Sequence, residues 1–188
     1  MSSLLSSIGY YTGLTSASYY TYINVNDYFQ GESDINDITQ VAEHLYICNY
    51  ETSCNKQALE ESGITHIINC VYGLANRYPD DFVYKNIPLL DDPNEDIMPY
   101  IAEVNQFIDD AVKNFNGDVV IHCMMGHSRS VSLLAAYIIY KGKGRVDVKG
   151  ALEFIKGKRG KINPNMGYIA QLEKYYEVVC QLNQNKDS

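Results

Sequence analysis

The sequence predicts an α/β fold in which a central mixed sheet is flanked by helices. Two observations support this prediction. Short apolar runs with the length of buried strands alternate with segments whose apolar residues recur at helical spacing. The end of the chain contains helical patterns only, which is typical of a compact sandwich with the sheet at its centre. A length of 188 residues is enough for one domain with a substantial core.

The first part of the domain contains three predicted strands and one helix. We expect strands at 44–49, 65–71 and 82–89, because each is a short apolar run bounded by polar or turn residues. A short helix is expected at 54–62, and Gly63 ends it.

The second part begins with a loop at 91–96, which contains a proline. A long amphipathic helix is expected from 97 to 115, and a buried strand from 119 to 122. Three further helices complete the prediction, at 130–141, 146–157 and 166–182.

We divide the chain into an N-terminal extension at 1–38, a globular domain at 39–182 and a polar tail at 183–188. The extension is rich in Ser, Gly and Tyr, and its aromatic content is too high for a simple flexible linker. We therefore expect it to pack either on the domain or on a second copy in a homodimer.

The composition argues against several classes of protein. The net charge of −8 disfavours nucleic-acid binding. No apolar run is long enough to span a membrane, and the start of the chain lacks the pattern of a secretory signal, so we expect an intracellular protein, cytoplasmic or nuclear. The five cysteines form no CxxC pair and have no His at zinc-site spacing. We expect neither a metal nor another cofactor.

The segment 141–161 differs from the rest of the chain because its net charge is +6. A basic face of this kind could bind an anionic partner. A solvated helix surface is the simpler interpretation, and we adopt it.

The segment VVIHCMMGHSRS (119–130) places Cys123 directly after a buried strand and Arg129 at the start of a helix. This transition gathers backbone N–H groups and the positive end of the helix dipole around a volume suited to a dianion. Gly126 permits the backbone torsions that such a nest requires. Arg129 can hold two phosphoryl oxygens. In this setting Cys123 should ionise readily and attack phosphorus.

The string HCMMGHSRS resembles the signature HCxxGxxR of cysteine-dependent protein phosphatases, and SRS followed by VSLLAAYIIY resembles the dual-specificity phosphatases. Further similar segments extend the resemblance over about 39–182: HLYICN, GITHIINC, IPLLDD and INPNMGYIAQLEKYY. The resemblance implies a protein tyrosine phosphatase-like sandwich and a catalytic domain at 39–182. The extension is too short for a rhodanese-like docking domain, so we expect a member of the small atypical group.

The resemblance also implies roles for the residues of the motif. Cys123 matches the nucleophile, Arg129 the phosphate clamp, and Ser130 the hydroxyl that assists the departing thiolate. His122 matches the residue that supports the loop and tunes the thiolate. The phosphate-binding backbone would comprise Met124, Met125, Gly126, His127 and Ser128.

His127 departs from many relatives, which have an aliphatic residue at this position. Its imidazole either contacts substrate or faces solvent, and we favour solvent.

The departing oxygen also needs a proton, and the candidate acids lie in LLDDPNEDI. The family carries its acid on the loop before the helix that leads to the cysteine strand, and Asp91 matches that place. Asp92 is the alternative. Both could instead cap a helix or lie in a solvated turn, although Asp96 is better placed for capping.

We therefore expect a metal-free phosphatase that acts on phosphotyrosine, and also on phosphoserine or phosphothreonine, of phosphoprotein substrates. One alternative is a catalytically weak phospho-binding scaffold, but such proteins usually lack the nucleophile, clamp or acid. Another is a phosphatase for phosphoinositides or RNA 5′-phosphates. The loop MMGHS lacks the lysines of the related lipid phosphatases, which counts against a lipid substrate.

Cys70 follows a neighbouring strand. We raise the hypothesis that it forms a protective disulfide with oxidised Cys123, which requires the two Cα atoms to lie within about 7 Å.

Overall fold

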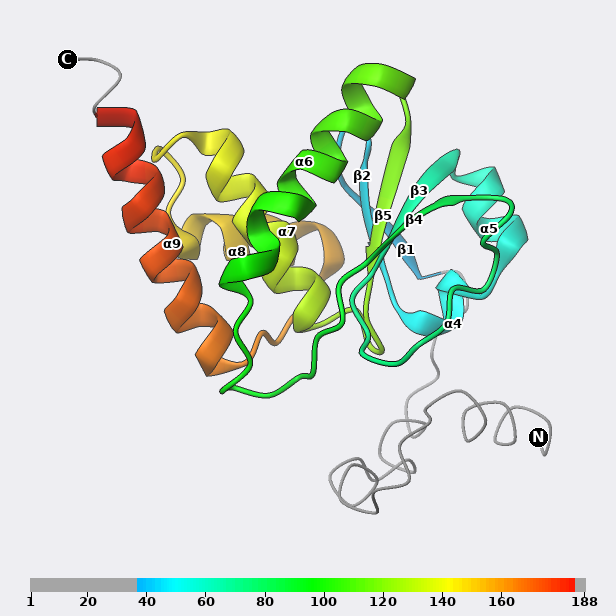
Figure 1. Cartoon of the computed structure of the whole chain (residues 1–188), viewed down its shortest axis with the longest axis horizontal. Coiled ribbons are helices and arrows are strands. Elements are labelled where there is room, and N and C mark those ends of the chain that lie inside the picture. The colour runs from blue at the N-terminus through cyan, green and yellow to red at the C-terminus, as the bar shows by residue number, and fades with distance from the viewer. Residues whose placement is uncertain (1–36, 185–188) are drawn as a thin grey trace.

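A computed structural model describes residues 37–184, which form a five-stranded mixed sheet with helices on both faces (Figure 1). The strand order is β1-β2-β5-β3-β4; β1 pairs antiparallel with β2, and the other pairs are parallel. The strands are β1 (Ile38–Ala42), β2 (Leu45–Cys48), β3 (Ile64–Asn69), β4 (Val83–Asn86) and β5 (Asp118–His122). The predicted α/β fold with a central mixed sheet is confirmed.

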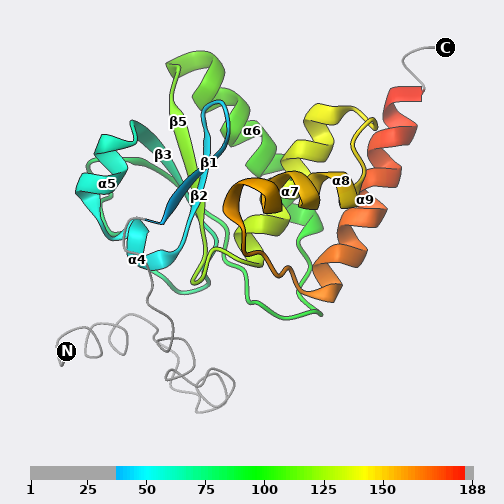
Figure 2. The same ribbon diagram turned by 180° about the vertical axis from the view of Figure 1, so that it is seen from behind.

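The helices lie in two groups on opposite faces of the sheet (Figures 1 and 2). The short helices are α4 (Tyr50–Ser53) and α5 (Lys56–Glu61), and the longer ones are α6 (Met98–Phe115), α7 (Arg129–Gly142), α8 (Val148–Arg159) and α9 (Met166–Gln184). The helices α6 to α9 cover one face, and α5 covers the other. Because α7 is surrounded by α6, α8 and α9, most of its side chains are buried.

Alternate residues of the central strands form two separate cores. Ile68 and Ile121 face α6 to α9, whereas Ile67 and Val120 pack with Leu59 of α5. This is the period-2 pattern of a strand buried on both faces. The carboxyl ends of the parallel strands β2, β5 and β3 lie side by side at one end of the sheet. The loop at residues 123–128, here called the cysteine loop, begins there.

Strand β1 lies at the edge of the sheet and was not predicted from the sequence. Only Val41 of this strand is fully buried, so β1 lacks the apolar alternation that identifies a strand. A tight turn joins it to β2, with His44 in the left-handed region at φ 60°. The short helix α4 was also missed, because a single turn has almost no periodicity.

Residues 37 and 38, assigned to the extension from sequence, belong to the domain: Ile38 begins β1 and Asp37 contacts Arg159. At the other end α9 continues to Gln184, two residues beyond the predicted helix. The predicted packing of the extension and the remainder of the tail lie outside the described residues. Within 37–184, no helix is long and apolar enough to cross a membrane.

Candidate active site

The loop from Cys123 to Ser128 joins the end of β5 to the first residue of α7. Gly126 within it has φ 64°, a conformation that other residues adopt with strain. A Cβ on Gly126 would lie 2.5 Å from the carbonyl oxygen of Cys48 and 2.6 Å from Nη2 of Arg159. The loop can close this tightly because glycine occupies its bend.

Three carbonyl groups of the loop are held from outside it. The Met124 oxygen accepts from the Tyr50 N–H at 2.9 Å, and the His127 oxygen accepts from the Asn163 N–H at 2.8 Å. The Gly126 oxygen accepts from Nε of Arg159 at 2.8 Å. In a planar trans peptide the following N–H points the opposite way from the carbonyl. The N–H groups of residues 125, 127 and 128 are therefore turned toward the inside of the loop.

Cys123 lies at the base of this loop and is only 1% exposed. Its sulfur is 3.2 Å from the Ser130 hydroxyl oxygen. Burial by itself raises the pKa of the thiol, but the Arg129 guanidinium, the Ser130 hydroxyl and the backbone N–H groups of Ser128 and Ser130 outweigh burial. The net result is a pKa below the ordinary value, as expected for a reactive cysteine.

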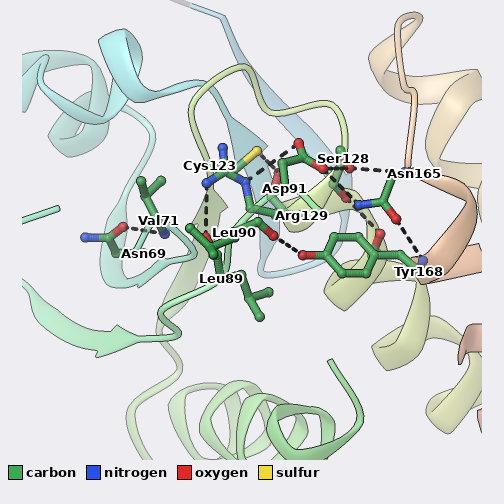
Figure 3. A network of polar contacts seen from close by, with 12 residues as sticks. Asn69, Val71, Leu89, Leu90, Asp91, Cys123, Ser128, Arg129, Asn165 and Tyr168 are labelled. Atoms are coloured by element: carbon green, nitrogen blue, oxygen red, sulfur yellow. Dashed lines mark hydrogen bonds and ion pairs between the residues drawn. The ribbon is translucent and has the colours of Figure 1, made fainter. Parts of the chain in front are cut away.

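The Arg129 side chain is buried beside the loop (Figure 3). One of its terminal nitrogens donates to the Leu89 carbonyl at 3.2 Å, and its Nε lies 3.8 Å from Oδ2 of Asp91. The guanidinium is thus fixed between the cysteine loop and the segment at 89–96 that precedes α6, here called the acidic loop. A planar group held in this way is suited to bidentate binding of a phosphoryl group.

Asp91 is held beside the cysteine loop by two hydrogen bonds to the same carboxylate oxygen, one from the loop and one from the residue before α9 (Figure 3). Its Oδ1 accepts from the Ser128 hydroxyl at 2.6 Å and from the Asn165 amide at 3.0 Å. Asp92 instead accepts from the backbone and side chain of Asn94 in an exposed turn. The structure therefore places the first of the two candidate acids, and not the second, beside Arg129.

Helix α9 holds the loop that carries Asp91. The Tyr168 hydroxyl donates to the Leu90 carbonyl, and the Gln171 amide bridges the Glu95 carbonyl and the Ile97 N–H. A Cβ on Gly167 would lie 1.8 Å from the Pro93 carbonyl oxygen, so only glycine permits this approach. Asp96 accepts from the Met98 N–H at 3.0 Å and satisfies a donor at the start of α6, as its sequence position suggested.

The two histidines of the motif differ in their surroundings. Burial lowers the pKa of His122 to about 4, so its imidazole is neutral near pH 7. A neutral ring adds no positive charge beside Cys123, with whose backbone His122 forms a hydrogen bond. His127 is half-buried, and its pKa is lowered by burial and by Arg159 and Lys161. The expectation that His127 faces solvent thus holds for only part of its ring.

Three residues of this site were not predicted from the sequence: Asn165, Tyr168 and Arg159. Asn165 directly precedes α9, and its side-chain oxygen also accepts from the Tyr168 N–H at the start of that helix. A helix from residue 166 was expected from the sequence, but nothing local connected Asn165 with Asp91. Arg159 was grouped with the solvated lysines of 141–161, although its side chain is 2% exposed.

Three cysteines lie at the ends of neighbouring strands, in the order Cys48 (β2), Cys123 (β5) and Cys70 (β3) across the sheet. Asn69 pairs with His122, and the Cys70 N–H donates to the His122 carbonyl at 2.9 Å. Burial raises the pKa of Cys70 and of Cys48, so neither thiol is readily ionised. The disulfide between Cys70 and Cys123 stays a prediction. In the described part of the chain, no group of three or more His, Cys, Asp or Glu side chains is arranged to hold a metal ion.

Comparisons with known proteins agree with this geometry. A family model for the dual specificity phosphatase catalytic domain matches residues 45–178. Dual specificity protein phosphatase 1B of Arabidopsis thaliana is 38% identical over 140 residues, which are 74% of this chain and 81% of that protein.

Two solved structures also resemble the fold. A mouse putative dual specificity phosphatase matches with a TM-score of 0.73 at 25% identity, covering 82% of this chain and 96% of that chain. A human tyrosine phosphatase-like serine/threonine/tyrosine-interacting protein matches with a TM-score of 0.70 at 26% identity, covering 75% and 96%.

The matched range lies within the domain that the sequence predicted and contains the acidic loop, the cysteine loop and Asn165. The family resemblance inferred from the motif is confirmed. The chain belongs to the dual specificity phosphatases and is a cysteine-dependent protein phosphatase.

Proposed function

We propose that this phosphatase hydrolyses phosphotyrosine, and also phosphoserine and phosphothreonine, in proteins through a cysteinyl-phosphate intermediate on Cys123. One observation carries the proposal. The chemistry needs three groups, and they meet at one loop: Cys123 and Arg129 lie at its two ends, and Asp91 reaches it from the segment before α6. A nucleophile, an anion clamp and an acid are thus available to the same phosphoryl group.

In the first step the Cys123 thiolate attacks phosphorus, and the bond between phosphorus and the leaving oxygen breaks. The inward N–H groups of the loop and the Arg129 guanidinium hold the phosphoryl oxygens as charge moves onto them. Asp91 donates its proton to the departing phenolic or alcoholic oxygen. The products of this step are the dephosphorylated side chain and the cysteinyl phosphate.

The hydrogen bonds of Asp91 indicate which oxygen carries the proton. Oδ1 already accepts from Ser128 and Asn165, whereas Oδ2 is the oxygen nearer to Arg129. We assign the transferred proton to Oδ2, because two donors directed at Oδ1 leave it poorly placed to bear a hydrogen.

In the second step water attacks phosphorus, and the bond between sulfur and phosphorus breaks. The Asp91 carboxylate takes a proton from the water, and inorganic phosphate is released. The departing Cys123 thiolate accepts a hydrogen bond from Ser130, whose oxygen lies 3.2 Å away. Ser130 can donate in this way because a hydroxyl rotates to suit its partner.

Features of the relatives support the proposal. The mouse structure is a complex with zinc tungstate, and tungstate is a tetrahedral oxyanion like phosphate. The Arabidopsis protein is named for dual specificity. The human neighbour is named as tyrosine phosphatase-like and as an interacting protein. A protein with this fold can therefore be named for binding and not for catalysis. Because this chain retains the nucleophile, clamp and acid, we favour catalysis over a scaffold role.

A substrate panel tests the proposal. Turnover is measured on a phosphotyrosine peptide, a phosphothreonine peptide, a phosphoinositide and an RNA 5′-triphosphate, with Cys123→Ser as the inactive control. We expect hydrolysis of both peptides at rates well above those of the other two. A preference for the lipid or the RNA would replace the proposed substrate class, and no turnover of any substrate would favour the scaffold.

A further inference from the structure

Arg159 is a buried cation that lies outside the motif but contacts it. It comes from the last residue of α8, and its side chain is 2% exposed. Its Nε donates to the Gly126 carbonyl at 2.8 Å. Its two terminal nitrogens donate to the carboxylate oxygens of Asp37 at 2.7 and 3.1 Å, and one of them also donates to the Thr39 hydroxyl at 3.1 Å.

This arrangement uses the shape of the guanidinium. Two nitrogens form a paired contact with the Asp37 carboxylate, and the third faces the Gly126 carbonyl. A carbonyl that accepts from a charged donor is held more firmly than one that accepts from a neutral N–H. The peptide between Gly126 and His127 is planar and trans, so the His127 N–H is directed away from Arg159. It points to the inside of the cysteine loop, here called the phosphate cradle.

We propose that Arg159 is a positioning residue of the phosphate cradle, which orients the His127 N–H toward bound phosphate by holding the Gly126 carbonyl, and that Asp37 holds Arg159 in place. The inference rests on the proposed function, since the cradle is taken to bind the substrate phosphoryl group. It assigns a role at the active site to two residues outside the signature.

The contacts also distinguish Arg159 from a second phosphate ligand. All three of its nitrogens donate to protein oxygens, and the carboxylate of Asp37 balances its charge. Arg129, by contrast, is buried beside the cradle, with its Nε facing the proposed acid Asp91. Arg159 therefore acts through the backbone of the loop and does not touch the substrate.

The central variant is Arg159→Met, which keeps an unbranched apolar stem but removes all of the donors. The matched control is Lys158→Met, which removes one positive charge from the preceding residue of α8, where the side chain is exposed. Arg159→Lys keeps the charge but cannot donate to Gly126 and to both Asp37 oxygens at once. Asp37→Asn leaves the guanidinium without its balancing charge.

The variants are compared by kcat and KM on a phosphotyrosine peptide, by vanadate inhibition, and by the rate at which iodoacetamide alkylates Cys123. For Arg159→Met we expect KM and the vanadate inhibition constant to rise at least about tenfold, the loss that removal of a hydrogen bond to a charged group typically causes. Arg159→Lys should recover part of this loss, and Asp37→Asn should fall between Arg159→Lys and the parent. Lys158→Met should match the parent.

Thermal unfolding of every variant separates positioning from general damage. If Arg159→Met does not fold, Arg159→Lys and Asp37→Asn still carry the comparison. If folded variants at Arg159 and Asp37 bind vanadate as Lys158→Met does, the positioning role is wrong although the phosphatase assignment stands. If the parent protein turns over no phosphopeptide but binds vanadate, the proposed function fails, and vanadate affinity alone decides the role of Arg159.

Discussion

The Ser128 hydroxyl donates to Oδ1 of Asp91 at 2.6 Å, so the loop that follows β5 is tied to the loop that precedes α6. The amide of Asn165 donates to the same oxygen from the start of α9. The proposed acid is therefore positioned by two segments that are distant from it in sequence. Its alignment with the cradle depends on contacts that can be removed one at a time.

Asp91→Asn should remove the proton donor while the shape of the side chain is kept. In the parent, kcat/KM against pH should be bell-shaped, because Cys123 must be ionised and the acid protonated. Asp91→Asn should reduce the rate by about 10² to 10⁴ for a poor leaving group and flatten the basic limb. The loss should shrink for a leaving group of low pKa, which departs without help.

Asp92→Asn is the matched control, because the Asp92 side chain is directed to Asn94 in an exposed turn. Its pH profile should resemble that of the parent. A flattened basic limb in Asp92→Asn, together with a normal one in Asp91→Asn, would show that the acid had been assigned to the wrong neighbour.

Asn165→Asp should weaken the alignment of Asp91 while sparing the helix. The substituted carboxylate can still accept from the Tyr168 N–H at the start of α9, but it cannot donate to Asp91 and instead repels it. We expect about a tenfold loss of kcat for an alkyl phosphate and a smaller loss for an activated aryl phosphate. Equal losses for both substrates would mean that Asn165 does not act through the acid.

Gly167→Ala should displace the acidic loop, because the added methyl group would overlap the Pro93 carbonyl. Backbone cannot yield as a flexible side chain can, so kcat should fall most for poor leaving groups, and the melting temperature should also fall. Gly157→Ala is the control: nothing lies within 4 Å of a Cβ at this position of α8. This variant should keep full activity and gain about 0.5–1 kcal/mol of stability, since alanine favours a helix.

His122 should make the protein less stable in mild acid. Burial holds its folded pKa at about 4, whereas the unfolded chain takes up a proton near 6.5. The unfolded state therefore binds more protons between these values, so the free energy of unfolding falls as pH falls from 6.5 toward 4, by at most about 3 kcal/mol. Urea unfolding at pH 7 and 4.5 should show this fall.

The matched variant His122→Gln should show a smaller fall between the same two pH values. The pKa values of His66 and His127 are also lowered by burial, so these residues contribute to the fall in both proteins. An identical pH dependence in parent and variant would exclude His122 as a source.

The parts of the fold and site that the sequence predicted are those encoded within a short stretch. The strand β5, the cysteine loop and the start of α7 follow one another directly, so the pattern of apolar residues around Cys123 was sufficient. The edge strand β1 was missed because most of its side chains are only partly buried. Contacts such as Asn165 with Asp91 and Arg159 with Gly126 depend on how distant segments pack, which no local pattern in a single sequence records.

The covalent intermediate is the central claim, and direct detection of phosphate on Cys123 tests it most sharply. Ser130→Ala should slow release of the thiolate, because the hydroxyl 3.2 Å from the sulfur is lost, while attack on an activated aryl phosphate continues. A reaction of this variant is quenched in acid, digested and analysed by mass spectrometry. We predict one phosphorylated peptide with the phosphate on Cys123, and none in Cys123→Ser. Phosphate on another residue, or turnover by Cys123→Ser at more than a trace of the parent rate, would contradict the mechanism.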